Sequence, residues 1–236
     1  MTAQSRREML LVAHTGRASR TPLLGVNLGK VGFLTEADPE QLDAVLESIV
    51  TRGYNVRERM TVDVRVEHDG RELDRGWALN EVSIEKATRE RILDVVVEVD
   101  GHGVSAFGCD GVLIATPTGS TAYAFSAGGP IVWPEVEALL LVPISAHALF
   151  SRPMVVSPDS VLAVEVLANN EGSGVMWCDG RRAVELPPGA RVQACRGELS
   201  VLLARLQTAP FTDRLVRKFD LPVRGWRAGR SDGGGA

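Results

Sequence analysis

The sequence has little of several residue types that mark particular classes of protein. Its 236 residues include only 3 cysteines and 4 histidines. They follow no zinc or disulfide spacing, which predicts structural thiols in a reducing compartment and no zinc site. Lys and Arg number 26 against 30 Asp and Glu, a net charge of −4 without a block of one sign. This balance gives no support for a nucleic-acid or membrane-surface partner.

Long apolar runs are also missing from the sequence. No run approaches the length of a membrane span, and the early apolar stretch 9–13 is shorter than the core of a signal peptide. We therefore expect a cytoplasmic protein. A content of 44% hydrophobic and 24% charged residues is that of an ordinary globular protein, long enough for one large or two small domains.

The first part of the chain has the pattern of an α/β unit. Residues 23–28 predict a buried parallel strand, followed by a glycine-containing loop. A helix is then expected, with Asp38 as N-cap, Pro39 in its first position and Gly53 at its end. Its apolar stripe consists of Leu42, Val45, Leu46, Ile49 and Val50.

The pattern changes after Tyr54, where apolar and polar residues alternate. Asp-Gly pairs at 69–70, 100–101 and 179–180 predict hairpin turns. Strands are expected at 60–66, 77–84, 93–99, 104–107, 161–166, 175–178, 191–195 and 201–206. The chain thus predicts an α+β or α/β fold, with an α/β part over 1–55 and a β-rich domain over 56–211. A helix within 212–226 would return to the first part, and 227–236 is a tail too polar to pack.

The segment 107–123 is the strongest candidate for a binding site. The apolar strand 112–114 runs into Pro117 and then into Gly119-Ser120-Thr121, which offers small side chains and backbone N–H groups at the expected start of a helix. Such a turn suits phosphate, carboxamide or ribose. The alternative is an ordinary helix start capped by Ser or Thr.

Three further pairs or clusters carry polar chemistry within the β-rich part. Asn80-Glu81 interrupts the apolar stretch 77–84, and a glutamate can accept hydrogen bonds from both ribose hydroxyls; the alternative is a solvent-facing pair on an edge strand. Asp110, followed by Gly111, is either a turn residue or a ligand contact. The 179–182 cluster is either a hairpin turn or a source of arginines for phosphate.

Taken together, several strings resemble the NAD kinase family. They are Leu79-Asn80-Glu81, Asp110-Gly111, Thr116-Pro117-Thr118-Gly119-Ser120-Thr121-Ala122-Tyr123, Ser126-Ala127-Gly128-Gly129-Pro130 and Arg152-Pro153. The resemblance runs from about residue 22 to 226, and 211–219 is similar to actinobacterial members in particular. It implies a Rossmann-like α/β domain followed by a β-sandwich domain, with the site between them. It also implies transfer of the terminal phosphoryl group of ATP, or in some members of polyphosphate, to the adenosine 2′-hydroxyl of NAD. The reaction would use Mg²⁺ and give NADP.

The resemblance also implies roles for individual residues. Asn80 and Glu81 would bind the polar edges of NAD, and Asp110 would hold an adenosine-side or nicotinamide-side group. Arg91, Asp179 and Arg181 would make further polar contacts. The dinucleotide pocket would be lined by the turn, with Thr118, Gly119, Ser120, Thr121, Ala122, Tyr123 and Ser126.

One family motif is missing from the sequence. Family members carry Gly-Gly-Asp-Gly, whose aspartate is taken to activate the attacking hydroxyl, and this chain has no such string. Residues 9–17 resemble the family's opening strand, yet 18–20 join it almost directly to a strand that comes much later in relatives. Because a parallel crossover needs about a dozen residues, an internal stretch is missing, either by a deletion or in a naturally shortened relative. We therefore expect NAD binding with almost no phosphoryl transfer.

Three hypotheses follow for the activity. The first is an NAD kinase, and the second is a non-catalytic dinucleotide-binding relative that forms oligomers. Because a shortened α/β part leaves faces uncovered, we expect a homo-oligomer, a dimer or tetramer, or a tendency to aggregate. The third, a serine hydrolase using Ser120 with His147 and Asp110 or Asp179, is disfavoured because 119–121 is not a nucleophile elbow.

Overall fold

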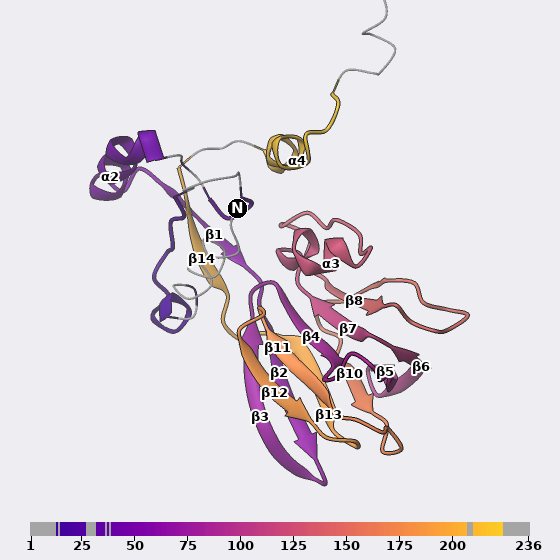
Figure 1. Ribbon diagram of the computed structural model, residues 1–236. Coiled ribbons are helices and arrows are strands. Elements are labelled where there is room, and N and C mark those ends of the chain that lie inside the picture. The colour runs from indigo at the N-terminus through magenta and orange to yellow at the C-terminus, as the bar shows by residue number, and fades with distance from the viewer. Residues whose placement is uncertain are drawn as a thin grey trace, which may run out of the picture. The chain divides into compact units, whose positions relative to one another are not determined.

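Figure 1 shows the computed structural model of the chain, which describes residues 13, 15–26, 32–35, 37, 39–206 and 210–223. Contacts group the described residues of 22–57 and 203–223 into one unit, and residues 13–21 and 58–202 into a second. The domain limits expected from the sequence, 1–55 and 56–211, stay a prediction, and the polar tail 227–236 lies outside the described residues. Within the described part, no helix is long and apolar enough to cross a membrane.

The first unit holds a short helical segment, two helices and parts of two strands. The elements are η1 (Pro39–Gln41), α2 (Leu42–Val50), β1 (Asn55–Arg59), β14 (Val201–Arg205) and α4 (Phe211–Phe219), and β1 pairs with β14. Parallel bridges join Leu23 to Leu203 and Val26 to Ala37. Of the strand expected over 23–28, residues 27 and 28 lie outside the described residues, as does the expected N-cap Asp38.

Helix α2 forms where it was expected but buries little of its apolar stripe. Only Val45 is buried, whereas Leu46 is 52% exposed and Val50 is 83% exposed. The helix ends at Val50, three residues before Gly53, in a turn where Arg52 has a φ of 54° and the Gly53 N–H donates to the Ser48 carbonyl oxygen at 2.8 Å. The stripe residues therefore lie on a helix as expected, and Val45 is the stripe residue that is buried.

The second unit is built from two six-stranded antiparallel sheets (Figure 1). The first sheet has the order β3-β2-β13-β10-β5-β6, and the second has the order β12-β11-β4-β7-β8-β9. The strands of the first are β2 (Val62–His68), β3 (Arg71–Ala78), β5 (Leu93–Val99), β6 (His102–Cys109), β10 (Leu162–Val166) and β13 (Arg191–Arg196). Those of the second are β4 (Glu81–Lys86), β7 (Gly111–Ala115), β8 (Leu139–Ile144), β9 (Met154–Val156), β11 (Gly174–Cys178) and β12 (Arg182–Leu186).

A single apolar core joins the two sheets. Alternate residues of β2 and β5, such as Val64 and Val95, lie in the same buried cluster as Ile84 of β4 and Ile114 of β7. Because side chains of a strand alternate between faces, each sheet directs one face into this cluster. The β-sandwich expected from the sequence is therefore present, and the predicted α+β class is confirmed.

Hairpin turns are the elements that the sequence predicted most accurately. The Asp-Gly pairs at 69–70, 100–101 and 179–180 have positive φ at both residues, from 50° at Asp69 to 76° at Gly101. This is the conformation of the two-residue turns that match the twist of paired strands. Asp179-Gly180 joins β11 to β12 in this way.

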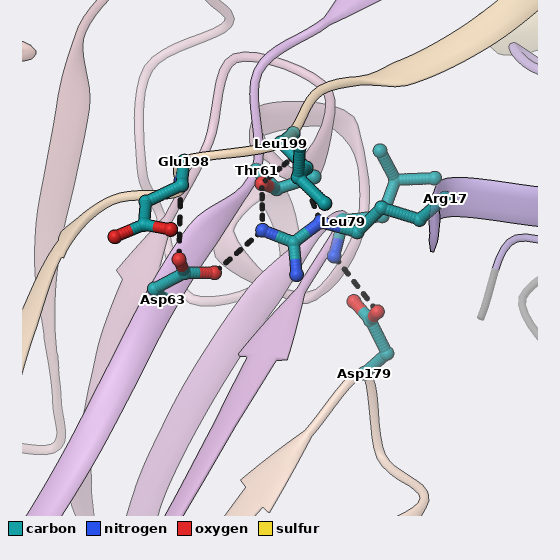
Figure 2. A network of polar contacts seen from close by, with 7 residues as sticks. All are labelled: Arg17, Thr61, Asp63, Leu79, Asp179, Glu198 and Leu199. Atoms are coloured by element: carbon teal, nitrogen blue, oxygen red, sulfur yellow. Dashed lines mark hydrogen bonds and ion pairs between the residues drawn. The ribbon is translucent and has the colours of Figure 1, made fainter. Parts of the chain in front are cut away.

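A short helical segment, residues 15–19, is tied to the β-sandwich by Arg17 (Figure 2). The Arg17 guanidinium lies 2.7 Å from the Asp63 carboxylate and donates to the Leu199 carbonyl oxygen at 2.8 Å and the Thr61 hydroxyl at 3.2 Å. It also lies over the Trp77 ring, 4.4 Å from the centroid. With 11% of its side chain exposed, Arg17 holds this segment against the first sheet.

Candidate functional site

The candidate site begins at a corner where the chain passes from one sheet to the other. The sequence predicted a continuous strand over 77–84, but β3 ends at Ala78 and β4 begins at Glu81 in the second sheet. Asn80 is 6% exposed and Glu81 is 9% exposed. The prediction of one strand is therefore wrong, and so is the alternative of a solvent-facing pair on an edge strand.

Two residues satisfy the backbone of this buried corner. The Asp179 carboxylate accepts from the N–H groups of Leu79 at 2.8 Å, Asn80 at 2.7 Å and Glu81 at 3.3 Å, and the Asp179 N–H donates to the Glu81 carbonyl oxygen. The Thr116 hydroxyl donates to the Leu79 carbonyl oxygen at 2.6 Å, and the Thr116 N–H to that of Asn80 at 2.9 Å. All six backbone groups of 79–81 are thus paired by Asp179 and Thr116.

Asp179 is itself buried, at 7% exposure. Burial raises the pKa of its carboxyl, while the N–H groups of Leu79, Asn80 and Glu81 act against this rise. Figure 2 shows the carboxylate directed at the Leu79 N–H. The sequence resemblance implied a ligand contact for Asp179, whereas the geometry gives its carboxylate a role in shaping the corner.

The turn after β7 differs from the helix start that the sequence predicted. Residues Gly119–Thr121 form a 3-10 turn, η2, and Tyr123–Ser126 form the short helix α3, with a break at Ala122. The N–H of Gly119 donates to the Thr116 hydroxyl, and that of Ser120 to the Thr116 carbonyl oxygen. The expectation of free N–H groups at these two residues is therefore wrong, because the turn closes on Thr116.

The small residues of this turn have distinct packing roles. A Cβ on Gly119 would lie 2.0 Å from the Asn80 carbonyl oxygen, so the glycine lets the turn lie directly against the corner. Ser120 is fully buried, and its hydroxyl donates to the carbonyl oxygens of Pro117 and Val132. Because the Ser120 hydroxyl is engaged inside the fold, the geometry gives no support to a nucleophilic serine.

Another crossing between the sheets lies at Asp110, between β6 and β7. The Lys86 ammonium lies 2.6 Å from the Asp110 carboxylate, and the Asp110 side chain is 45% exposed. Hydrogen bonds from Lys86 and then Ser145 lower the pKa of Asp110. Asp110 is thus an ionised, partly exposed carboxylate, as a polar ligand contact requires.

Tyr123 connects this crossing electrostatically to the corner. Burial raises the pKa of the Tyr123 phenol, and the negative charges of Glu85, Glu81 and Asp110 raise it further. An effect of this kind needs charges at short range. Strand register places Glu81 opposite Ala115 at the start of β4, and Glu85 opposite Gly111, so Asp110 lies beside the other end of the same strand. Asn80 and Glu81 are joined to the turn around Gly119 through Thr116.

The remaining predicted site residues lie in loops, in turns and on α3. Arg91 lies in the exposed loop after β4 and forms an ion pair with Glu171. Arg181 is exposed beside the Asp179 turn, and its positive charge lowers the pKa of Asp179. Ser126 is exposed at the end of α3. Thr118, Thr121 and Ala122 are half-buried within the turn.

Sequence reasoning missed two residues, Lys86 and Thr116. Lys86 lies five residues after Glu81 on β4, and register with β7 brings the end of β4 to Asp110, which no local motif reveals. Thr116 was visible as the first residue of the Thr-Pro-Thr-Gly string. The burial that marks its hydroxyl as structural is not visible in the sequence.

The described residues do not form a metal centre by themselves. Within the described ranges, no group of three or more His, Cys, Asp or Glu side chains is placed to hold a metal ion. Two of the three cysteines, Cys109 and Cys178, are buried, and burial raises the pKa of each thiol to about 12. We derive no chemical step from a protein-bound metal or a thiolate.

Comparison with known proteins gives two family matches on this chain. Residues 8–54 match the ATP-NAD kinase N-terminal domain, and residues 79–206 match the ATP-NAD kinase C-terminal domain. The chain is 64% identical over 219 residues to NAD kinase 2 of Streptomyces coelicolor, covering 93% of this chain and 72% of that protein. It is 59% identical over 218 residues to NAD kinase of Rhodococcus opacus, covering 92% of this chain and 68% of that protein.

Two solved structures share the fold. The yeast NADH kinase complexed with NADH matches with a TM-score of 0.75 at 23% identity, over 90% of this chain and 60% of that one. An NAD kinase from Archaeoglobus fulgidus in complex with ATP matches with a TM-score of 0.70 at 29% identity, over 85% and 75%. The chain thus spans less than two thirds of the yeast kinase and about seven tenths of the two bacterial relatives.

These matches and the two-sheet fold define a kinase, a transferase of phosphoryl groups. More closely, the chain belongs to the ATP-NAD kinase family. The resemblance read from the sequence strings is therefore confirmed.

Proposed function

We propose that this chain binds NAD at the Leu79–Glu81 corner and that its reaction is phosphorylation of the adenosine 2′-hydroxyl of NAD by ATP. The observation that carries this proposal is the burial of Asn80 and Glu81 in a corner whose backbone is fully hydrogen-bonded. Asp179 and Thr116 supply the hydrogen-bond partners of the backbone N–H and carbonyl groups in this corner. Membership of the ATP-NAD kinase family supplies the substrate class.

Each side chain of the site has a role in this proposal. Glu81 accepts hydrogen bonds from ribose hydroxyls, and Asn80 offers a donor and an acceptor to an amide or base edge. Asp110, kept ionised by Lys86, accepts from an N–H group of the adenine or the nicotinamide carboxamide. The half-buried turn residues Thr118, Thr121 and Ala122, with Tyr123, Ser126 and the underlying Gly119 and Ser120, give the pocket its shape.

The proposed reaction forms a bond between the ribose 2′-oxygen and the γ-phosphorus of ATP, and breaks the bond from that phosphorus to the β–γ bridging oxygen. The products are NADP, ADP and the proton of the 2′-hydroxyl. Phosphoryl transfer depends mainly on positioning and charge stabilisation. We propose ATP as its magnesium complex, with the metal bound by substrate phosphates.

The binding part of the proposal is tested by titrating NAD into the purified chain by calorimetry. We expect saturable binding by the parent chain and binding weakened by tenfold or more in Glu81→Ala and Asp110→Ala, with unfolding temperatures near the parent value. The control is Asp159→Ala, an exposed carboxylate in the turn between β9 and β10. Parent-like NAD affinity in both site variants would contradict the proposed site.

The chemical part is tested by NADP formation from NAD and MgATP. A general base typically contributes about 10²–10⁴-fold, so without the Gly-Gly-Asp-Gly aspartate we expect turnover lower by about that factor. A chimera that carries the corresponding segment of the S. coelicolor relative between Arg17 and Thr21 should recover the lost turnover. The same chimera with asparagine in place of that aspartate is the control. Equal rates of NADP formation by the parent chain and the chimera would refute the argument from the missing motif. A chimera that binds NAD but forms no NADP would refute the proposed reaction.

Several finer properties belong to the same proposal. The phosphoryl donor includes polyphosphate as an alternative to ATP, and the protein is a cytoplasmic homo-oligomer, a dimer or tetramer. Exposed apolar side chains such as Phe150 at 53% and Trp133 at 42% support subunit contacts. Light scattering coupled to size-exclusion chromatography tests this, since a single monomeric species would contradict it.

A further inference from the structure

Thr116 connects the corner at residues 79–81 to the turn at residues 118–123, although it is not among the residues predicted to contact NAD. It is fully buried, at 0% exposure, at the end of β7. Its hydroxyl donates to the Leu79 carbonyl oxygen at 2.6 Å and accepts from the Gly119 N–H at 3.2 Å. One hydroxyl group therefore joins the corner before β4 to the turn after β7.

The opposite side of the corner is held by Asp179. Its carboxylate accepts hydrogen bonds from the three N–H groups of 79–81, while the Thr116 hydroxyl and N–H donate to the carbonyl oxygens of Leu79 and Asn80. Leu79 and Asn80 lie between β3 and β4, so strand pairing alone does not fix their conformation. If Thr116 or Asp179 is replaced, a buried backbone N–H or carbonyl group of the corner loses its hydrogen bond, at a cost of about 1–3 kcal/mol. The corner then adopts another conformation because this cost is avoided there.

We propose that Thr116 is a positioning residue for NAD recognition: together with Asp179 it fixes the 79–81 backbone, and so fixes the direction in which the Asn80 and Glu81 side chains leave it. Thr116 itself touches no ligand in this arrangement. The inference rests on the proposed NAD site. It adds that affinity depends on a hydroxyl buried behind the site.

The test compares Thr116→Val, which removes the hydroxyl at nearly constant volume, with Thr116→Ser, which keeps it. NAD affinity is measured by calorimetry at 10 °C, well below unfolding, and thermal unfolding is recorded for each variant. We expect Thr116→Val to weaken NAD binding by about 10-fold or more and Thr116→Ser to bind within about 3-fold of the parent. The matched control is Ser160→Ala, which removes a buried hydroxyl bonded to Asp100 in the turn between β5 and β6. It should lower the unfolding temperature and leave NAD affinity unchanged.

A double variant separates positioning from general destabilisation. If Thr116 acts through the corner, Glu81→Ala with Thr116→Val should bind NAD less weakly than the product of the two single effects predicts, because part of the Thr116 effect is already lost with Glu81. Independent, multiplicative effects would overturn the inference. So would parent-like affinity in Thr116→Val, or a failure of Thr116→Ser to retain binding.

The outcomes also distinguish this inference from the proposed function. Loss of affinity in Glu81→Ala with none in Thr116→Val rejects only the positioning role. Unchanged affinity in Glu81→Ala rejects the NAD site itself. Should Thr116→Val not fold, Thr116→Cys replaces it, because a thiol of similar size is only a weak hydrogen-bond donor, and the same expectations apply.

Discussion

At the scale of single residues, Lys86 sets the charge state of Asp110. The two side chains lie 2.6 Å apart, and hydrogen bonds from Lys86 and Ser145, with the charge of His147, lower the pKa of Asp110. A carboxyl whose pKa is lowered on folding adds stability above its unfolded pKa of about 3.9, and this contribution is lost as the pH falls through the folded value. For so exposed a pair the contribution is about 1 kcal/mol or less.

The variant Lys86→Gln should therefore return the pKa of Asp110 towards its ordinary value. Carbon-13 NMR titration of the Asp110 carboxyl between pH 2 and 6 measures this directly. Arg89→Gln, which neutralises an exposed cation in the next loop, serves as control and should leave the titration unchanged. An identical Asp110 titration in Lys86→Gln and the parent would show that the ion pair is not formed in solution.

At the scale of elements, the turn after β7 depends on a close approach of two backbones. A side chain at Gly119 would overlap the Asn80 carbonyl group, at 2.0 Å from its oxygen and 2.5 Å from its carbon. Both atoms belong to backbone that Thr116 and Asp179 hold in place, so neither can move without breaking hydrogen bonds. The glycine is thus required by contact, not by an unusual φ.

We expect Gly119→Ala to destabilise the chain by about 1–3 kcal/mol, as overpacking typically does, and to weaken NAD binding. Gly103→Ala is the matched control, because a Cβ on this β6 glycine meets nothing within 4 Å. Urea denaturation of both variants gives the comparison. Equal stability of the two alanine variants would mean that the turn does not lie against the corner.

Element by element, the sequence predicts turns and alternation better than it predicts crossings. The Asp-Gly hairpins were predictable because both residues tolerate positive φ and the strands beside them alternate. The corner at Asn80 was not, because a continuous apolar stretch is equally compatible with one strand and with two strands in different sheets. What breaks the strand is Asp179, about a hundred residues away in the sequence.

The same limit applies to the site. Asn80, Glu81, Asp110 and the 116–123 turn could be named from their strings, and Thr116 joins the 79–81 corner to that turn. Their individual roles as ligand contacts remain predictions. Lys86 and Thr116 could not be identified, because one depends on strand register and the other on a hydroxyl buried behind the turn.

At the scale of the whole molecule, Arg17 ties the segment 13–21 to the β-sandwich. Its guanidinium has an ion-pair partner, two further acceptors and an aromatic ring, which come from three separate places in the chain. Arg20, three residues later, forms an exposed ion pair with Glu58, with side chains 53% and 61% exposed. The two arginines therefore differ in environment within one short segment.

We expect Arg17→Ala to cost about 1–3 kcal/mol of stability, since hydrogen bonds to charged groups contribute in this range, and to speed cleavage of residues 15–21 by subtilisin. Arg20→Ala should change stability by less than about 1 kcal/mol. Chemical denaturation and timed proteolysis, followed by mass spectrometry, measure both effects. Equal behaviour of the two variants would contradict the assigned role of Arg17.

The corner at residues 79–81 joins the two layers of the sandwich, and its amide protons are held by a buried carboxylate. Releasing them would separate layers that share one apolar core. In deuterated solvent these three amides should therefore exchange only when the entire domain opens, as slowly as the central strands. The recognition surface would then lack the local looseness that is usual for ligand-binding loops, and would be ready for its ligand before the ligand arrives.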